Sequence, residues 1–200
     1  MQKTFVTILL LGSAVAAFPQ GTVYFSNNLF TKVSFAYGLG PVPTTPGLIN
    51  YGLFYGIGES TSLTFLSTSL GVNSTAVSGV IASPLDGVSV IPLLAIPGTQ
   101  PGEDDVWVQV AGWTASFGTD WRTAEAAAAA MDGWFGETGV LNLGGLGSTT
   151  GPGVLMWQLP TGTDPHRFAG GFVLSSGPEP STMALFGLGF AALLTFRRRK

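Results

Sequence analysis

Residues 105–113 read Asp-Val-Trp-Val-Gln-Val-Ala-Gly-Trp, which is the clearest structural pattern in the chain. Two sets of side chains alternate along it. One set holds Val106, Val108 and Val110, and the other holds Trp107, Gln109 and Ala111. Strict alternation over this length is typical of a β-strand that buries one face. The stretch therefore predicts a half-buried strand.

Short apolar runs separated by turn-forming residues fill the rest of the middle of the chain. The 200 residues include 29 Gly and 13 Pro, while charged residues make up only 10%. This composition favours an all-β protein with about eight to ten short strands. Beyond residues 105–113, the expected strands cover residues 22–25, 30–37, 49–57, 62–67, 75–82, 87–94, 134–143, 154–159 and 167–175.

One segment has the pattern of a helix. Residues 121–131 are rich in Ala, Asp120 stands where an N-terminal cap is expected, and Asp132-Gly133 provides a stop. We therefore predict an all-β single domain, a β-sandwich or jelly-roll-like fold with one short crossover helix.

The first 17 residues are typical of a secretory signal peptide. Lys3 supplies a positive charge, residues 5–12 are apolar, and small residues follow. Ala14, Ala16 and Ala17 mark the expected cleavage region. We expect the exported domain to span residues 18–177.

The last stretch predicts a membrane helix. Residues 181–196 are apolar and carry no charge, and four cations follow: Arg197, Arg198, Arg199 and Lys200. An apolar helix satisfies its own backbone in lipid, and a basic end resists translocation. The expected topology places residues 1–177 on the far side of the membrane from this basic cluster.

The expected domain between these ends is acidic. Residues 18–177 contain three cations and ten anions, which gives a net charge of 3 − 10 = −7. Because nucleic-acid binding needs clustered Lys and Arg, we expect no nucleic-acid partner. The chain has no cysteine, which excludes disulfides, a thiol nucleophile and a Cys-ligated metal.

The residues directly before the apolar run are Pro178, Glu179 and Pro180. A Pro-Glu-Pro triplet, an apolar span and a basic end, in this order, resemble the PEP-CTERM sorting signal of exported bacterial proteins. The resemblance implies recognition by a membrane protease, the exosortase, and cleavage at or near the triplet. The segments 20–27, 41–56 and 107–136 also resemble small proteins of this kind from planctomycete–verrucomicrobial bacteria, which are mostly of unknown function.

Side chains for catalysis are scarce. His166 is the single histidine, and no Gly-x-Ser-x-Gly elbow accompanies it and Asp164, so a Ser-His-Asp hydrolase is disfavoured. Glu103, Asp104 and Asp105 form the densest acidic cluster and are a weak candidate for Ca²⁺, although their spacing fits no calcium loop. We expect no cofactor and no catalytic residue.

The aromatic content leaves a glycan ligand open. Trp107, Trp113 and Trp134 are candidates for stacking on sugar rings, although large aromatic residues in a β-sandwich more often fill the core. Hydrolysis would need two facing carboxylates. The acids available for such a pair are Asp105, Asp120, Asp132 and Glu137.

These patterns together predict an exported protein without enzymatic activity. The precursor is expected to be anchored transiently in the inner membrane and then delivered to the cell surface or the extracellular matrix, with a structural or adhesive role linked to exopolysaccharide. One alternative is a carbohydrate-binding or weakly glycan-processing surface protein. Another is a periplasmic protein that stays anchored in the membrane.

Overall fold

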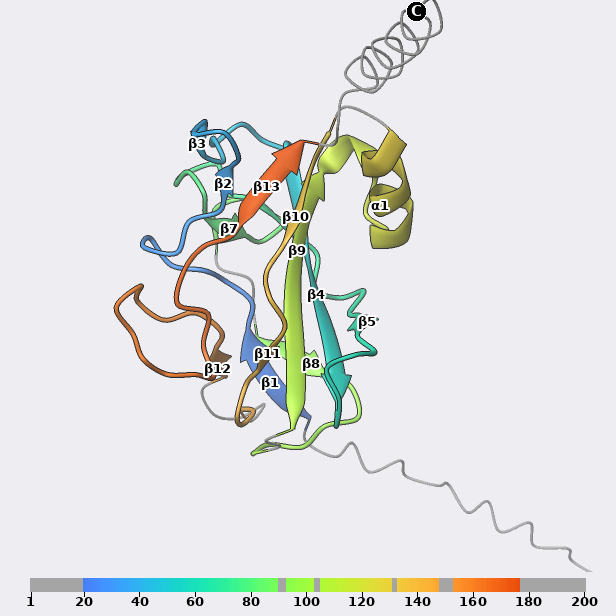
Figure 1. The fold of residues 1–200 in the computed structure, drawn as a ribbon, viewed down its shortest axis with the longest axis vertical. Helices are drawn as coiled ribbons and strands as arrows, with labels where there is room; N and C mark the ends of the chain where they lie inside the picture. Colours follow the sequence, from blue (N-terminus) through green and yellow to red (C-terminus); the bar gives the residue numbers. More distant parts are fainter. Residues whose placement is uncertain (1–19, 90–92, 103–104, 131–132, 148–152, 177–200) are drawn as a thin grey trace, which may run out of the picture.

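The structure is a computed structural model that describes residues 20–89, 93–102, 105–130, 133–147 and 153–176 (Figure 1). The expected signal peptide, the sorting triplet, the membrane helix and its basic end lie outside these residues. In the described part, strands dominate and one short α-helix is present, so the prediction of an all-β domain with one short helix is confirmed.

Most of the strands are short. Their bounds are β1 Gly21–Tyr24, β2 Ser34–Phe35, β3 Gly40–Pro41, β4 Ile49–Ile57, β5 Thr64–Phe65, β6 Gly71–Asn73, β7 Ile81–Ala82, β8 Leu94–Ile96, β9 Val106–Thr114, β10 Trp134–Glu137, β11 Leu141–Asn142, β12 Val154–Leu155 and β13 Val173–Ser176. The 3-10 turn η1 covers Ala115–Phe117, and the helix α1 covers Trp121–Ala130.

The two nine-residue strands β4 and β9 form the centre of the larger sheet. They pair antiparallel along their whole length, from Ile49 opposite Thr114 to Ile57 opposite Val106. The order of this sheet is β3-β2-β13-β10-β9-β4-β6-β7, and a second sheet has the order β12-β1-β8. Figure 1 shows β4 and β9 running side by side down the length of the domain.

The alternation along residues 106–111 sets the two faces of the larger sheet. Val106, Val108 and Val110 are fully buried, while Trp107 and Gln109 on the other face are half-buried, as the sequence predicts. The valines share one core with residues of the smaller sheet, such as Val23 and Ile96, and with Leu53 and Leu174. The two unequal sheets therefore enclose the main core between them.

The helix α1 packs on the opposite face of the larger sheet. Trp121 and Ala124 form a second buried cluster with Ala111 and Trp113 of β9. The rings of Trp113 and Trp121 meet edge to face with centroids 5.3 Å apart. This face therefore gains a second, aromatic core beside the helix.

The expected crossover role of the helix is wrong. The helix connects β9 to β10, and these strands are direct antiparallel neighbours, with Gly136 opposite Gly112. A crossover helix joins parallel strands, whereas antiparallel neighbours need only a turn. The helix is thus an insertion between two paired strands. Parallel pairing of β1 with β12 and of β2 with β13 also departs from the jelly-roll-like pattern.

The expected cap at the start of α1 is confirmed. A carboxylate oxygen of Asp120 accepts hydrogen bonds from the backbone N–H and the hydroxyl of Thr123, at 3.0 and 3.1 Å. These two bonds hold the pKa of the Asp120 carboxyl below its ordinary value, because both favour the charged form.

A buried asparagine ties the long loop before β4 to the sheet. The Asn73 side-chain oxygen accepts the backbone N–H groups of Leu48 and Ile49, and its amide donates to the carbonyls of Pro43 and Thr45. The side chain is 1% exposed. One polar side chain thus satisfies four backbone groups of a turn-rich segment.

Replacing Asn73 with Ala should lower the free energy of unfolding by about 2 kcal/mol or more, because two N–H groups next to the core lose their acceptor. Chemical denaturation of the domain measures this change. The nearby exposed Thr68→Ala is the matched control and should stay within about 0.5 kcal/mol of the parent. Equal stability of the two variants would contradict the role given to Asn73.

Replacing Asp120 with Ala should lower the melting temperature at neutral pH. Since the folded-state pKa of Asp120 is lowered, its contribution is present above the ordinary aspartate pKa and is lost as the pH falls through the folded-state value. The difference from wild type should therefore vanish in strong acid. Thermal melts across a pH series measure it, and a difference that persists unchanged at low pH would contradict a role for the carboxylate.

Candidate functional site

The sorting residues themselves are not part of the described chain, but the strand that leads to them is. The last described strand, β13, is hydrogen-bonded on one side to β10 and on the other to β2. Its last described residue is Ser176, and in the sequence Gly177 alone separates Ser176 from Pro178. The triplet thus follows directly on a strand that is held from both sides.

Several other predicted site residues also lie outside the described part: Ala14, Ala16, Ala17, Glu103, Asp104, Pro178, Glu179, Pro180, Arg197, Arg198, Arg199 and Lys200. In residues 20–176, as far as the structure describes them, no helix is long and apolar enough to cross a membrane. No group of three or more His, Asp or Glu side chains with metal-binding geometry occurs in these described segments either.

Trp113 and Trp134 both lie in contact with other core side chains. Trp113 is fully buried, and its indole N–H donates to the carbonyl of Gly118 at 2.8 Å. Trp134 is half-buried, with its ring 4.3 Å from that of Phe35. Trp113 therefore has no ring face left for an external ligand and is a core residue.

Trp107 has a more open position at the other end of β9. Its indole N–H donates to a carboxylate oxygen of Asp105 at 3.1 Å, and the amide of Asn142 reaches the same oxygen at 3.4 Å. Trp107 stands between Gly56 of β4 and Asn142 of β11 in the sheet. The half-buried ring and its polar neighbours form a small surface at this end of β9, and the stacking role of Trp107 stays a prediction.

A larger site lies between the helix α1 and the strands β4 and β5. It is a cleft of about 570 Å³, within the range of small-ligand sites. Three aromatic residues, two hydroxyls and three charged groups are among its lining residues: Phe54, Phe65, Trp121, Ser62, Thr64, Asp120, Arg122 and Glu125. The half-buried rings of Phe54 and Phe65, with hydroxyl and charged groups around them, are chemically suited to sugar rings and their hydroxyls.

The aromatic side of the cleft is built by strand pairing. Phe54 and Phe65 are direct partners across β4 and β5, and their ring centroids are 5.3 Å apart. The rings of Phe54 and Trp121 meet edge to face, with centroids 5.2 Å apart. Gly52 leaves room for this arrangement, since a side chain there would collide with Phe65.

Sequence reasoning missed Phe54, Phe65 and Arg122 as site residues. The available signal was an aromatic residue in each of two successive apolar runs, at 54 and at 65. Because the register of the β4–β5 pair was not known, nothing in the sequence placed the two rings together, or the helix beside them.

The lowered pKa of Asp120 does not suit a general acid. A general acid for glycoside cleavage needs a raised pKa, whereas the hydrogen bonds from Thr123 lower that of Asp120.

Two other groups with shifted pKa values, Tyr51 and Asp86, lie outside the cleft. Burial raises the pKa of Tyr51, whose hydroxyl lies in the main core. Hydrogen bonds from the hydroxyl of Ser89 and from the backbone N–H groups of Val88 and Ser89 lower the pKa of Asp86. Neither shift adds a group to a binding site.

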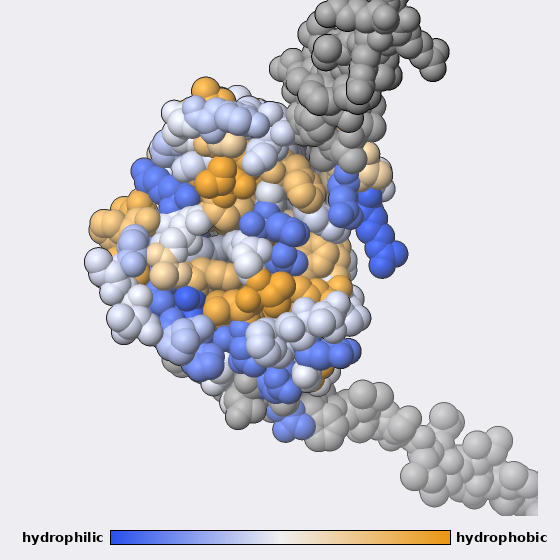
Figure 2. Space-filling view, in the orientation of Figure 1, coloured by the Kyte–Doolittle hydropathy of each residue, from blue (hydrophilic) through white to orange (hydrophobic). Residues whose placement is uncertain are grey.

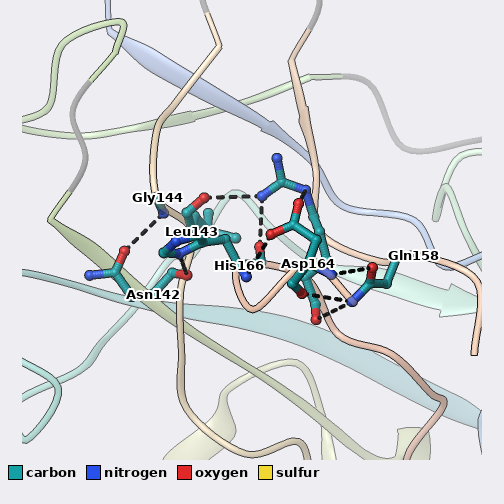
Figure 3. Close-up of polar contacts among 7 residues, drawn as sticks. Asn142, Leu143, Gly144, Gln158, Asp164 and His166 are labelled. Carbon is teal, nitrogen blue, oxygen red and sulfur yellow. Dashed lines mark hydrogen bonds and ion pairs between the residues drawn. The ribbon is translucent and has the colours of Figure 1, made fainter. Parts of the chain in front are cut away.

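His166 has a structural role in the loop between β12 and β13 (Figure 3). Its Nδ1 atom lies 3.0 Å from the carbonyl oxygen of Asn142, and its backbone N–H donates to Asp164. Gln158 and Asp164 exchange further hydrogen bonds, and the Arg167 guanidinium donates to the Leu143 carbonyl. These contacts fasten the loop to the chain around β11.

Comparison with known proteins identifies one segment of the chain. Residues 178–200 match the family described as the PEP-CTERM protein-sorting motif. No curated protein and no solved structure matches the chain. The resemblance to the planctomycete–verrucomicrobial type stays a prediction. The protein carries a PEP-CTERM sorting motif, which indicates export, a membrane-anchored precursor and processing by an exosortase for delivery to the cell surface.

Proposed function

We propose that the delivered domain is a non-enzymatic adhesive or structural protein of the cell surface that binds exopolysaccharide. The match of residues 178–200 to the sorting motif carries the proposal, because it indicates delivery to the cell surface, where we expect such polymers. The cleft beside α1 supports it with aromatic, hydroxyl and charged groups in one concave site.

We also propose that sorting of the precursor depends on the Pro-Glu-Pro triplet. Changing Pro178, Glu179 and Pro180 together to Ala should leave the precursor uncut in the cell envelope, because alanines permit the helical backbone that two prolines disfavour. Intact mass of the protein from envelope and medium measures this. A double Thr161→Ala, Thr163→Ala variant, changed at two exposed positions, should be processed like wild type.

Release of the triple-Ala protein at the wild-type mass would refute the dependence on the triplet. Retention of the residues after Pro180 on the wild-type protein would instead favour the alternative of a permanently anchored periplasmic protein.

Glycan binding is expected in the cleft. Arg122→Ala should weaken binding of the mature protein to exopolysaccharide purified from the producing cells by about tenfold, the loss of one charge-assisted hydrogen bond. Titration calorimetry or co-sedimentation measures the affinity. Arg122 is exposed, so its removal should leave the fold intact.

The comparison variant is Trp107→Ala, which removes the half-buried ring at the other end of β9 and should leave the affinity unchanged. If Trp107→Ala weakened the binding of exopolysaccharide and Arg122→Ala did not, the glycan site would be the Trp107 surface and not the cleft. No binding by the wild-type protein would overturn the exopolysaccharide role, while the sorting result would stand.

A further inference from the structure

The tail and one hairpin leave the domain at the same end. The strand β13 pairs in parallel with β2, with Val173 opposite Ser34, and the backbone N–H of Ala36 donates to the Leu174 carbonyl at 2.8 Å. Parallel neighbours end at the same edge of a sheet. The turn between β2 and β3 therefore lies at the same end of the domain as Ser176, the last described residue, as the positions of β2, β3 and the end of β13 in Figure 1 show.

The tether between sheet and membrane is short. From Ser176 to Ser181, where the expected membrane span begins, there are 181 − 176 = 5 residue steps. Fully extended, five steps cover at most about 18 Å. The lipid headgroup layer takes up about 5 to 8 Å of each leaflet. While the precursor is anchored, the end of the domain from which the tail leaves lies next to the bilayer surface.

The hairpin tip presents two large side chains at this end. Tyr37 is 80% exposed and Leu39 is 62% exposed. The turn is closed by a hydrogen bond from the Leu39 N–H to the Ala36 carbonyl, and Tyr37 and Gly38 have φ values of 60° and 74°. Such φ values match a type I′ turn, which usually holds Asn or Gly. A tyrosine is sterically disfavoured in this left-handed conformation, because its Cβ comes too close to the backbone.

The surroundings of the tip suit an approach to lipid. Residues 33–58 contain no Asp, Glu, Lys or Arg, so the hairpin and the loop after it bring no charge that would have to be desolvated. Tyrosine favours the interface, where its ring is buried and its hydroxyl stays wet. At the top of the view in Figure 2, where the β2–β3 hairpin lies, the surface is mostly pale with a small orange area.

We propose that the tip of the β2–β3 hairpin, residues 36–39, is a membrane-contacting element of the anchored precursor. Tyr37 and Leu39 enter the lipid headgroup layer next to the point where the tail enters the bilayer. Two side chains alone bind lipid weakly, but the tether holds them at high effective concentration. This contact would seat the domain and hold the Pro178 triplet at the membrane face. The proposal rests on the sorting function proposed above.

The test uses the full-length precursor in phosphatidylcholine vesicles. Since the chain has no cysteine, Leu39→Cys accepts a single environment-sensitive fluorophore without further changes. Brominated lipids then report whether the label lies in the bilayer. We expect a blue-shifted emission and quenching about twofold or more stronger than at a distant control position.

The control position is Leu159, labelled in the same way after Leu159→Cys. Leu159 is 52% exposed and lies in the loop between β12 and β13. His166 holds this loop against Asn142, and Asn142 pairs with Trp107 of β9. Thr114 lies at the end of the sheet from which the tail leaves. Trp107 is seven residues away from Thr114 along β9, which corresponds to about 24 Å.

A second variant separates membrane contact from folding. Tyr37→Asn suits the positive φ better than tyrosine, so the melting temperature should stay equal or rise. Quenching at position 39 should fall. Unchanged quenching would overturn the role given to Tyr37.

Flotation of the vesicles reports the anchor separately. A precursor that floats with the vesicles but shows no quenching at position 39 overturns the hairpin proposal and leaves the anchored precursor intact. A precursor that does not float overturns both. Quenching that needs a co-reconstituted exosortase overturns lipid as the partner and assigns the hairpin to the protease.

Discussion

Nine consecutive residue pairs join β4 to β9. The register of this pairing decides which side chains lie on each face of the larger sheet. Because side chains alternate along a strand, one register turns Val106, Val108 and Val110 toward the smaller sheet and Ala111 and Trp113 toward α1. A shift of one residue would exchange these two sets and expose the valines to water. The main core, the aromatic cluster and the cleft therefore all depend on this pairing.

The cleft follows from the second face of the ladder. With β5 added beside β4, Phe65 comes to lie next to Phe54, and the insertion of α1 between β9 and β10 brings Trp121 onto the same surface. The N-terminal cap by Asp120 fixes where the helix begins, and with it the position of Arg122 at the cleft. One inserted helix thus both closes an aromatic core and shapes a binding surface.

The larger sheet also connects the fold to export. The strand that leads to the sorting segment is held between β10 and β2, so a pull on the tail acts on hydrogen bonds at both edges of β13. Removal of the residues beyond the triplet leaves this strand untouched, because the strand ends before Pro178. The same parallel pair places the β2–β3 hairpin beside the exit of the tail, which is the basis for the proposed membrane contact.

The sequence alone determined the features that local patterns encode. The three-part motif at residues 178–200, the alternation at residues 106–111 and the capped Ala-rich helix each depend on neighbours within a few residues. The tertiary structure decided what depends on partners distant in the chain. It buried Trp113, paired Phe54 with Phe65 and made α1 an insertion between antiparallel neighbours. Strand order and register are set by the packing of the whole chain, and a single sequence pattern does not contain them.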